Sequence, residues 1–281
     1  MHKLIIPYDK LIKMWKRSIV SAVMPVFNEE KTVKRVVEVL VGNPQVDEVV
    51  VIDDGSSDDS LAILKKFATK IKLISIKKNK GKGWAVAKGL RKASGEIILL
   101  TDADLVNFND DYIKKLLEPM GKNGVEVVVG CLRKGKYVPA PFARLTGERV
   151  YYKKDLLPHL KEMRATRFGL EIFLNHLFKD KKIKKVSLVK LQGLYKYEKF
   201  SAKVAVKEYL NEGLEIAREL AKQERLMPSD LKIIEKLKKV SKVSEWKEKA
   251  KMIKNQRVRR FLQKYVMKYL PKRMSRRYYE S

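Results

Sequence analysis

Two aspartates separated by one residue, Asp102 and Asp104, are the side chains of this sequence best suited to chemistry. They directly follow an apolar run at 96–101 that is typical of a buried strand. Carboxylate oxygens are the preferred ligands of Mg²⁺ and Mn²⁺, and such ions usually also hold substrate phosphates. Because an Asp-x-Asp triplet also arises by chance at strand ends, its meaning depends on the segments that precede it.

Three other polar segments follow predicted strands in the first half of the chain. The strands and the segments after them are 18–24 with 25–30, 46–52 with 53–58, and 72–76 with 79–83. Amphipathic helices are expected between them, at 32–41, from 58 to about 70, and from 83 to about 93. Apolar strands that alternate with helices predict a mostly parallel sheet covered on both faces. Ligands of such sheets bind outside the carboxyl ends of the strands, so the polar segments should converge there.

Composition narrows the class of protein. The chain has 281 residues and 45% hydrophobic content, which suits a globular domain with an appendage. Its single cysteine, Cys131, excludes an intramolecular disulfide and a cysteine-built zinc site. No apolar run approaches the roughly 20 residues that span a bilayer, and residues 1–18 lack the apolar core of a signal peptide. We therefore expect a cytoplasmic location.

The positive charge is unevenly distributed. The formal net charge is +30; residues 1–130 carry 22 basic and 17 acidic side chains, whereas residues 131–281 carry 41 and 16. Such asymmetry indicates that the second half faces an anionic partner. A nucleic acid, an anionic membrane surface and a phosphorylated acceptor all fit this pattern.

Four segments together resemble the donor half of the family-2 glycosyltransferases, which have the nucleotide-sugar-binding GT-A fold. They are 24–30 (MPVFNEE), 51–58 (VIDDGSSD), 79–85 (NKGKGWA) and 101–105 (TDADL). Their order and spacing match over residues 18–135, and the likeness is greatest to polyprenyl-phosphate (dolichol-phosphate) sugar transferases and glucosyl-3-phosphoglycerate synthases. The resemblance implies an α/β GT-A fold and a divalent metal, Mg²⁺ or Mn²⁺.

The resemblance also implies a role for each donor-side residue. Pro25, Phe27 and Glu29 would border the nucleotide base, and Asp53 and Asp54 would contact the base or the ribose. Lys82 would contact the nucleotide. Asp102 would contact the ribose or the metal, and Asp104 would be the principal metal ligand. Adjacent carboxylates would repel each other without a partner, which a ribose or metal-bound nucleotide supplies. Gly81 and Gly83 would let the backbone approach a phosphate. Structural alternatives stay open: a strand end for Pro25, an ordinary turn for 53–56 and a solvated lysine at 82.

Three residues are candidates on the acceptor side. Arg133 follows the fifth predicted strand (125–130), and Arg149 closes the segment RLTGER at 144–149. Both are predicted to bind phosphate, for which a guanidinium offers a charge-assisted fork. Glu171, in FGLE at 168–171, would contact acceptor or metal, or simply favour a helix N-terminus. Val106 stands where dolichol-phosphate mannosyltransferases often carry glutamine, so the subfamily stays open.

The predicted organisation has three parts: an N-terminal extension (1–17), a catalytic domain (18–200) and a helical basic region (201–281). The catalytic domain divides into a donor half (18–130) and an acceptor half (131–200), with one more strand at 183–190. Between 251 and 280 there are 11 basic residues and one acid, with an apolar stripe at helical spacing: Val258, Phe261, Leu262, Tyr265, Val266 and Tyr269. This stripe predicts either an interfacial helix on an anionic membrane or a face packed on the catalytic domain.

The expected activity is transfer of a hexose from a nucleotide diphosphate sugar of the GDP-mannose or UDP-glucose type. The acceptor would be a polyprenyl phosphate, and the protein would bind peripherally to the inner face of the cell membrane to reach it. The catalytic residues would be Asp104, Arg133, Arg149 and Glu171. A phosphate acceptor is already an anion at pH 7, so no general base is needed. The alternatives are a small phosphorylated acceptor such as phosphoglycerate, a nucleotidyltransferase, or a nucleic-acid-binding protein, although no nucleic-acid motif is present.

Overall fold

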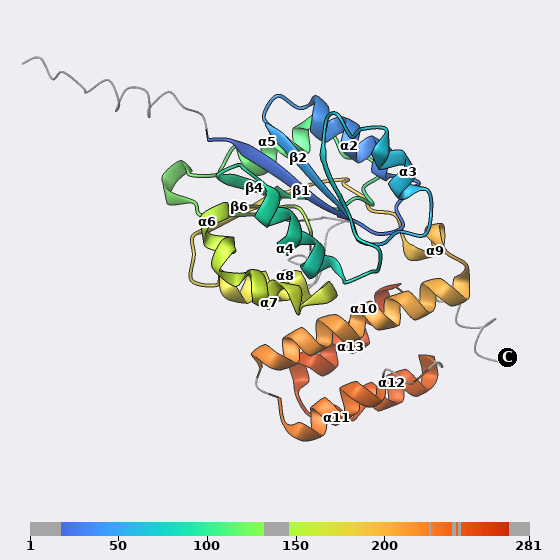
Figure 1. Cartoon of the computed structure of the whole chain (residues 1–281). Coiled ribbons are helices and arrows are strands. Elements are labelled where there is room, and N and C mark those ends of the chain that lie inside the picture. The colour runs from blue at the N-terminus through green and yellow to red at the C-terminus, as the bar shows by residue number, and fades with distance from the viewer. Residues whose placement is uncertain (1–17, 132–145, 225, 238–239, 241–242, 270–281) are drawn as a thin grey trace, which may run out of the picture.

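The computed structural model describes residues 18–131, 146–224, 226–237, 240 and 243–269. Within them, an α/β unit lies beside an all-helical unit (Figure 1). The strands are β1 (Val20–Val26), β2 (Glu48–Asp53), β3 (Lys72–Ser75), β4 (Ile97–Leu100), β5 (Val127–Cys131), β6 (Arg149–Tyr152) and β7 (Ile183–Ser187). The main helices are α2 (Val33–Gly42), α3 (Ser60–Lys65), α4 (Lys82–Lys92), α5 (Asp110–Leu117), α6 (Lys153–Leu156), α7 (Leu160–Arg164), α8 (Leu170–Leu177), α9 (Lys196–Lys199), α10 (Ala202–Gln223), α11 (Pro228–Leu237), α12 (Val243–Lys251) and α13 (Gln256–Tyr269).

The seven strands form one mixed sheet in the order β3-β2-β1-β4-β6-β5-β7. The four strands on the β3 side are parallel to one another, with Val23 of β1 opposite Val50 of β2 and Leu100 of β4. Strand β6 runs antiparallel to both its neighbours, and β7 is again parallel to β5. The predicted α/β class with a mostly parallel sheet is therefore confirmed, and β6, which the sequence did not indicate as a strand, is its antiparallel insertion.

Helices cover both faces of this sheet, as its nearly continuous apolar strands require. Side chains of β1 alternate: Ala22 and Met24 join the core under α2, α3 and α5, while Val23 joins the core under α4, α7 and α8. Pro25 was expected to end the first strand, but it lies within β1. The strand expected at 183–190 ends at Ser187.

The helices α10 to α13 enclose a separate hydrophobic core that also takes in Ile172 of α8. In the apolar stripe of α13, Val258, Phe261 and Leu262 are at most 2% exposed and pack in this core with Trp246. The prediction that this part of the stripe lies on a membrane is therefore wrong, because these side chains are already buried inside the protein. The packing alternative holds, but the partner is the helical unit rather than the sheet domain.

Some predictions fall on residues that the structure does not describe, namely the N-terminal extension at 1–17, Arg133, and the chain beyond 269. Among the described residues, none of the helices is both long enough and apolar enough to cross a membrane. The helical character expected beyond residue 200 is confirmed up to 269. The domain boundaries themselves stay predictions.

Candidate functional site

The polar segments that follow β1, β2 and β4 meet at the carboxyl ends of these strands, as predicted from their order. Direct hydrogen bonds join the first two segments: Ser57 N donates to Asn28 Oδ1 at 2.8 Å, and Glu29 N donates to Ser60 Oγ at 2.7 Å. Asn28 adopts a positive φ of 57°, a conformation that asparagine tolerates better than most residues. The loop after β1 is thereby held against the turn after β2.

Asp53 and Asp54 are both buried and both have protein partners. Asp53 accepts hydrogen bonds from Ser75 Oγ at 3.2 Å and from Ser56 N at 3.3 Å. The Asp54 carboxylate accepts from the backbone N–H groups of Lys80 and Gly81 at 2.8 and 2.7 Å. Burial raises the pKa of Asp54, and these two N–H groups oppose that rise. The backbone therefore supplies the partner that the sequence argument assigned to a ribose, and contact with a nucleotide stays a prediction.

Lys82, the first residue of α4, holds Asp102 at the end of β4. Its Nζ lies 2.6 Å from Asp102 Oδ1 and 2.6 Å from Glu171 Oε1, and its side chain is only 18% exposed. Burial opposes the charged ammonium, but the two carboxylates outweigh it and raise the pKa of Lys82. Gly147 faces the same carboxylate so closely that a Cβ there would overlap Asp102. We call Lys82, Asp102 and Glu171 the Asp102 cluster.

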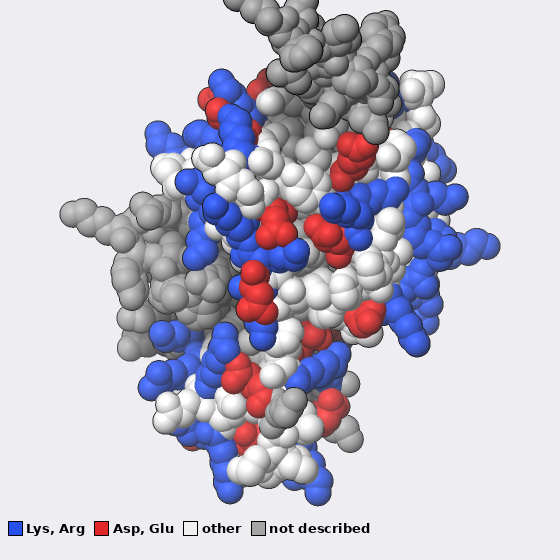
Figure 2. All heavy atoms as spheres, turned by 90° about the vertical axis from the view of Figure 1, so that its left-hand side faces the viewer, with Lys and Arg blue, Asp and Glu red and all other residues white. Residues whose placement is uncertain are grey.

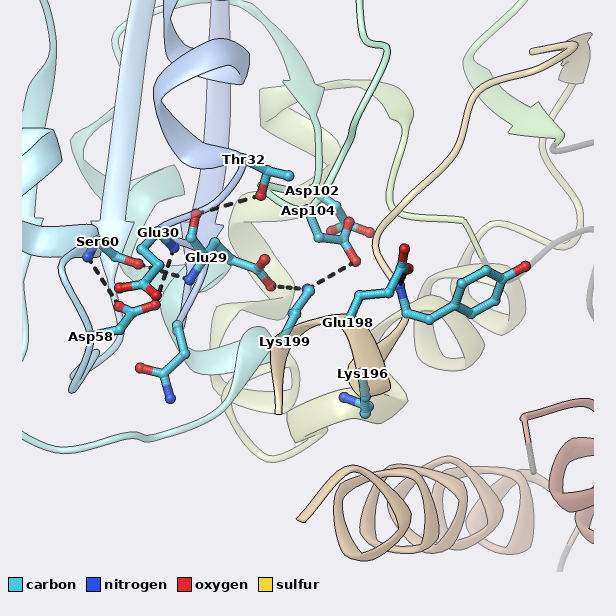
Figure 3. Close-up of polar contacts among 12 residues, drawn as sticks. Glu29, Glu30, Thr32, Asp58, Ser60, Asp102, Asp104, Lys196, Glu198 and Lys199 are labelled. Atoms are coloured by element: carbon cyan, nitrogen blue, oxygen red, sulfur yellow. Dashed lines mark hydrogen bonds and ion pairs between the residues drawn. The ribbon is translucent and has the colours of Figure 1, made fainter. Parts of the chain in front are cut away.

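A second lysine holds Asp104. Lys199 Nζ lies 2.6 Å from Glu29 Oε1 and 3.5 Å from Asp104 Oδ2, and Figure 3 shows it between the two carboxylates. Burial, and then the charge of Asp104, raise the pKa of Glu29 to about 7. Burial also raises the pKa of Asp104, against the pull of Lys199. We call Glu29, Asp104 and Lys199 the Asp104 cluster.

Glu148 is an acid that the sequence argument passed over. It is 1% exposed, and its Oε1 has no hydrogen-bond partner among the described residues. Burial, and then the charge of Asp102, raise its pKa to about 8. The signal was present in the Gly-Glu-Arg segment at 147–149, where only the arginine was singled out. A third carboxyl group thus lies near Asp102 and Asp104, which we call the acidic pair.

Arg149 lies inside the molecule. Its guanidinium donates to Thr146 O at 2.7 Å, to Asn175 Oδ1 at 2.9 Å and to Tyr151 Oη at 3.1 Å, and the residue is 1% exposed. These bonds join β6 to α8, the helix that carries Glu171. The geometry favours a supporting role for Arg149 over the predicted phosphate contact.

The remaining predicted residues have less defined surroundings. Pro25 and Phe27 are half-buried at the end of β1, beside Glu29. Gly83 was expected to admit a phosphate, but a Cβ there would overlap Met163 O and Thr166 Oγ1. Its small size therefore lets α4 pack closely on residues 163–166, and the contact of its backbone with a phosphate stays a prediction.

The carboxylates suit a metal ion that a substrate helps to hold. Among the residues that the structure describes, no group of three or more His, Cys, Asp or Glu side chains could hold a metal ion unaided. Mg²⁺ is usually bound by one or two carboxylates together with substrate phosphates and water. Asp104 fits this use, because its side chain is 32% exposed and its contact with Lys199 is long. Asp102 is the less available of the two, since Lys82 holds it at 2.6 Å.

Two lysines of α9 were missed by the sequence argument. Lys196 pairs with Glu212 at 2.9 Å, and its Nζ lies 5.3 Å from the centre of the Phe168 ring. Lys199 reaches the Asp104 cluster from a point 95 residues further along the chain. Neither lysine belongs to a recognisable motif, so only the fold reveals their position.

Comparison with known proteins finds several sugar transferases among the relatives of this chain. A glucosyl-3-phosphoglycerate synthase of Mycolicibacterium smegmatis is 36% identical over 124 residues, covering 41% of this chain and 41% of that protein. A dolichol-phosphate mannosyltransferase of Pyrococcus furiosus is 30% identical over 155 residues, covering 52% of this chain and 43% of that protein. The match therefore spans less than half the length of either relative.

The fold has solved counterparts. The glucosyl-3-phosphoglycerate synthase of Mycobacterium tuberculosis, solved with Mn²⁺, UDP-glucose and phosphoglyceric acid, superposes with a TM-score of 0.53. The two are 24% identical, and the match covers 69% of this chain and 78% of that one. Another structure of that enzyme holds Mg²⁺ and UDP. This likeness confirms the GT-A fold.

The profile of glycosyl transferase family 2 matches residues 21–185, more than half of the chain. That span contains every donor-side segment identified in the sequence. It also includes Asp102 and Asp104, and because the matching family is one of glycosyl transferases, the nucleotidyltransferase alternative is set aside. The chain belongs to glycosyl transferase family 2.

Proposed function

We propose that this glycosyltransferase moves a hexose from a nucleotide diphosphate sugar, of the GDP-mannose or UDP-glucose type, to a phosphorylated acceptor. The observation that carries the proposal is the convergence of Glu29, Asp102 and Asp104 with Lys82 at the carboxyl ends of the strands. Ligands of α/β sheets bind at these ends. The relatives support it, because their names state sugar transfer to phosphoglycerate or dolichol phosphate.

The donor would lie along the segments after β1, β2 and β4. Pro25, Phe27 and Glu29 border the base, and Asp53 and Asp54 support the ribose end. Asp54 acts through the loop it holds, since its carboxylate fixes the N–H groups of residues 80 and 81. Lys82 keeps Asp102 in place at 2.6 Å.

A divalent cation, Mg²⁺ or Mn²⁺, would be held by Asp104, with Asp102 beside it. When bound, it supplies positive charge to the diphosphate that leaves. The donor set suits this role, because an oxygen-ligand cation needs only one or two protein carboxylates when phosphates complete its coordination. The raised pKa of Asp104, caused first by burial, reflects a carboxylate that gains from a nearby cation.

On the acceptor side, a phosphate oxygen would attack the anomeric carbon as the bond from that carbon to the diphosphate oxygen breaks. No proton has to be removed from an acceptor that is already an anion. Arg133 is the proposed phosphate ligand, Glu171 orients Lys82, and Arg149 supports the helix that carries Glu171. Basic side chains outnumber acidic ones on the face shown in Figure 2, which is the side of the molecule where β1 begins and not the side of the donor segments, so the positive charge is not confined to the proposed site.

The proposed acceptor is a polyprenyl phosphate at an anionic membrane surface. The charge of residues 131–281, 41 basic against 16 acidic side chains, supports this choice. A small acceptor such as phosphoglycerate is the second candidate, favoured by the burial of the apolar face of α13. Either acceptor presents a phosphate for basic side chains to bind, but the step without proton removal applies to a polyprenyl phosphate, because phosphoglycerate also offers a hydroxyl group that loses a proton when it attacks.

The first test is a thermal-shift panel of UDP-, GDP- and ADP-sugars, with and without Mn²⁺. We expect one nucleotide sugar to stabilise the wild type only in the presence of the metal, and Asp104→Ala to lose this stabilisation. Absence of stabilisation by every nucleotide sugar contradicts the proposal. Sugar transfer is then assayed with a polyprenyl phosphate in anionic vesicles and with 3-phosphoglycerate in solution, and the productive arm identifies the acceptor.

A further inference from the structure

The segment that carries Lys199 is attached to the backbone of the acidic pair. Leu194 N donates to Asp104 O at 2.9 Å, and Val106 N donates to Gln192 O at 2.8 Å. Leu105 and Gly193 form an antiparallel bridge between these two bonds. The chain therefore crosses the end of the donor site before it turns into α9.

Helix α9 directs its two lysines differently. Lys196 is committed to Glu212 of α10 at 2.9 Å. Lys199 points the other way, towards the acidic pair, as Figure 3 shows, and its side chain is only 10% exposed. Lys31 also contacts this helix, by donating a hydrogen bond to the carbonyl oxygen of Glu198. Lys199 is thus placed by the fold, and its orientation is not that of a solvated surface lysine.

The two contacts of Lys199 are unequal. Its Nζ makes a short ion pair with Glu29 at 2.6 Å but lies 3.5 Å from Asp104. A divalent cation on Asp104 would come close to this ammonium and repel it. The nucleotide diphosphate that accompanies the cation offers new anionic oxygens in the same place, and a lysine can follow them on its flexible four-carbon stem.

We propose that Lys199 is a donor-positioning residue. Its ammonium neutralises part of the charge of Glu29 and Asp104 until a cation binds Asp104, and the side chain then moves so that the ammonium contacts the donor diphosphate. This inference rests on the proposed function. It assigns to α9 a closing role over the donor site, with the short pair to Glu29 keeping the ammonium within reach. It also predicts that Lys199 opposes the metal alone and favours the nucleotide diphosphate.

The test measures two affinities of Lys199→Met at pH 8. Binding of Mn²⁺ alone is followed by electron paramagnetic resonance of the free ion, and binding of UDP and GDP in saturating Mn²⁺ by calorimetry. We expect Mn²⁺ alone to bind about threefold more tightly, because a competing cation is gone. The nucleoside diphosphate should bind about tenfold more weakly, because a charge-assisted hydrogen bond is lost. Lys199→Arg should restore the second affinity towards that of the wild type.

Lys122→Met is the matched control. Lys122 forms an ion pair with Glu118, both side chains are more than half exposed, and neither residue belongs to the two clusters. This substitution should leave both affinities unchanged. If Lys199→Met changes neither affinity, or weakens both, Lys199 is only a structural ion-pair partner and the inference fails while the proposed function stands. If the wild type binds neither Mn²⁺ nor any nucleoside diphosphate, the proposed function fails and the inference falls with it.

Discussion

The two aspartates of the acidic pair are one residue apart, yet their surroundings differ. Asp102 faces Lys82, which α4 fixes between two carboxylates at 2.6 Å each. Asp104 faces Lys199, which reaches it at 3.5 Å from the four-residue helix α9. The Asp102 cluster is therefore a fixed part of the sheet domain, whereas the Asp104 cluster has one contact that is loose enough to be exchanged.

This difference assigns separate tasks to neighbouring residues. A carboxylate already neutralised by a buried lysine is a poor metal ligand, but it fixes the shape of the site. A carboxylate with a distant, replaceable cation is ready to accept a metal. We therefore propose Asp104 as the metal ligand and Asp102 as its support, and substitutions in the two clusters test this division.

The largest effect on stability is expected from Lys82→Met. Two carboxylates would lose their shared cation in a site where the lysine is only 18% exposed. Removing one partner from a buried ionic group costs about 3 kcal/mol or more. Urea unfolding should therefore show a marked loss of stability, while Lys122→Met, in a pair with both side chains more than half exposed, should stay within about 0.5 kcal/mol.

A second substitution separates the charge effect from lost packing. Adding Glu171→Gln to Lys82→Met removes one of the two stranded charges, so part of the stability should return. Equal stability of the single and double variants would mean that Lys82 acts through its packed aliphatic stem. The Asp102 cluster would then not be the fixed ionic element that the comparison requires.

The largest effect on activity is expected from Asp104→Asn. Asparagine keeps the shape of the side chain but loses the charge that would hold a metal. We expect the rate of sugar transfer to fall about 10²- to 10³-fold, as for other losses of one electrostatic contact in a transition state. Asp102→Asn should cost less, because Lys82 already offsets the charge of Asp102. Equal losses in a steady-state assay would contradict the division of tasks between the two aspartates.

Much of this arrangement followed from the sequence, and the reason is local. Each of the segments 25–30, 53–58 and 102–104 lies at the end of an apolar strand, and the alternation of strands and helices along the chain is enough to place them at one edge of the sheet. The lysine of α9 and the burial of Glu148 could not be predicted in this way. Both depend on how residues 146–200 return to the sheet, which involves the antiparallel β6 and contacts across 95 residues.

The apolar stripe of α13 shows what periodicity in a sequence cannot predict. Its helical periodicity correctly predicted an amphipathic helix, but periodicity cannot tell whether a membrane or another helix covers the apolar face. Here α10 and α12 cover Val258, Phe261 and Leu262. Only the three-dimensional structure shows whether a membrane or another helix covers this face, whereas the donor-side motifs could be interpreted from the sequence.

Glu29 makes stability depend on pH in a defined direction. Its pKa rises from the ordinary 4.5 to about 7 in the folded protein, first because of burial. Between these values the folded state holds a proton that the unfolded chain has lost, so this group lowers stability as the pH rises from 4.5 to 7. Relative to wild type, Glu29→Gln should gain roughly 1 to 3 kcal/mol from pH 5 to pH 7.5. Chemical unfolding of both proteins at several pH values measures this, and a constant difference would contradict it.

Of the two lysine substitutions within the clusters, Lys199→Met should have the smaller effect on stability, although it also removes a cation from between two carboxylates. Glu29, with a pKa of about 7, can take up a proton near neutral pH and so discharge itself at little cost. Asp104 is 32% exposed and retains contact with water. We therefore expect a loss of no more than about 1 kcal/mol in urea unfolding at pH 7. A loss as large as that of Lys82→Met would show that Lys199 is fixed as firmly as Lys82, and the Asp104 cluster could then not release its cation to a donor.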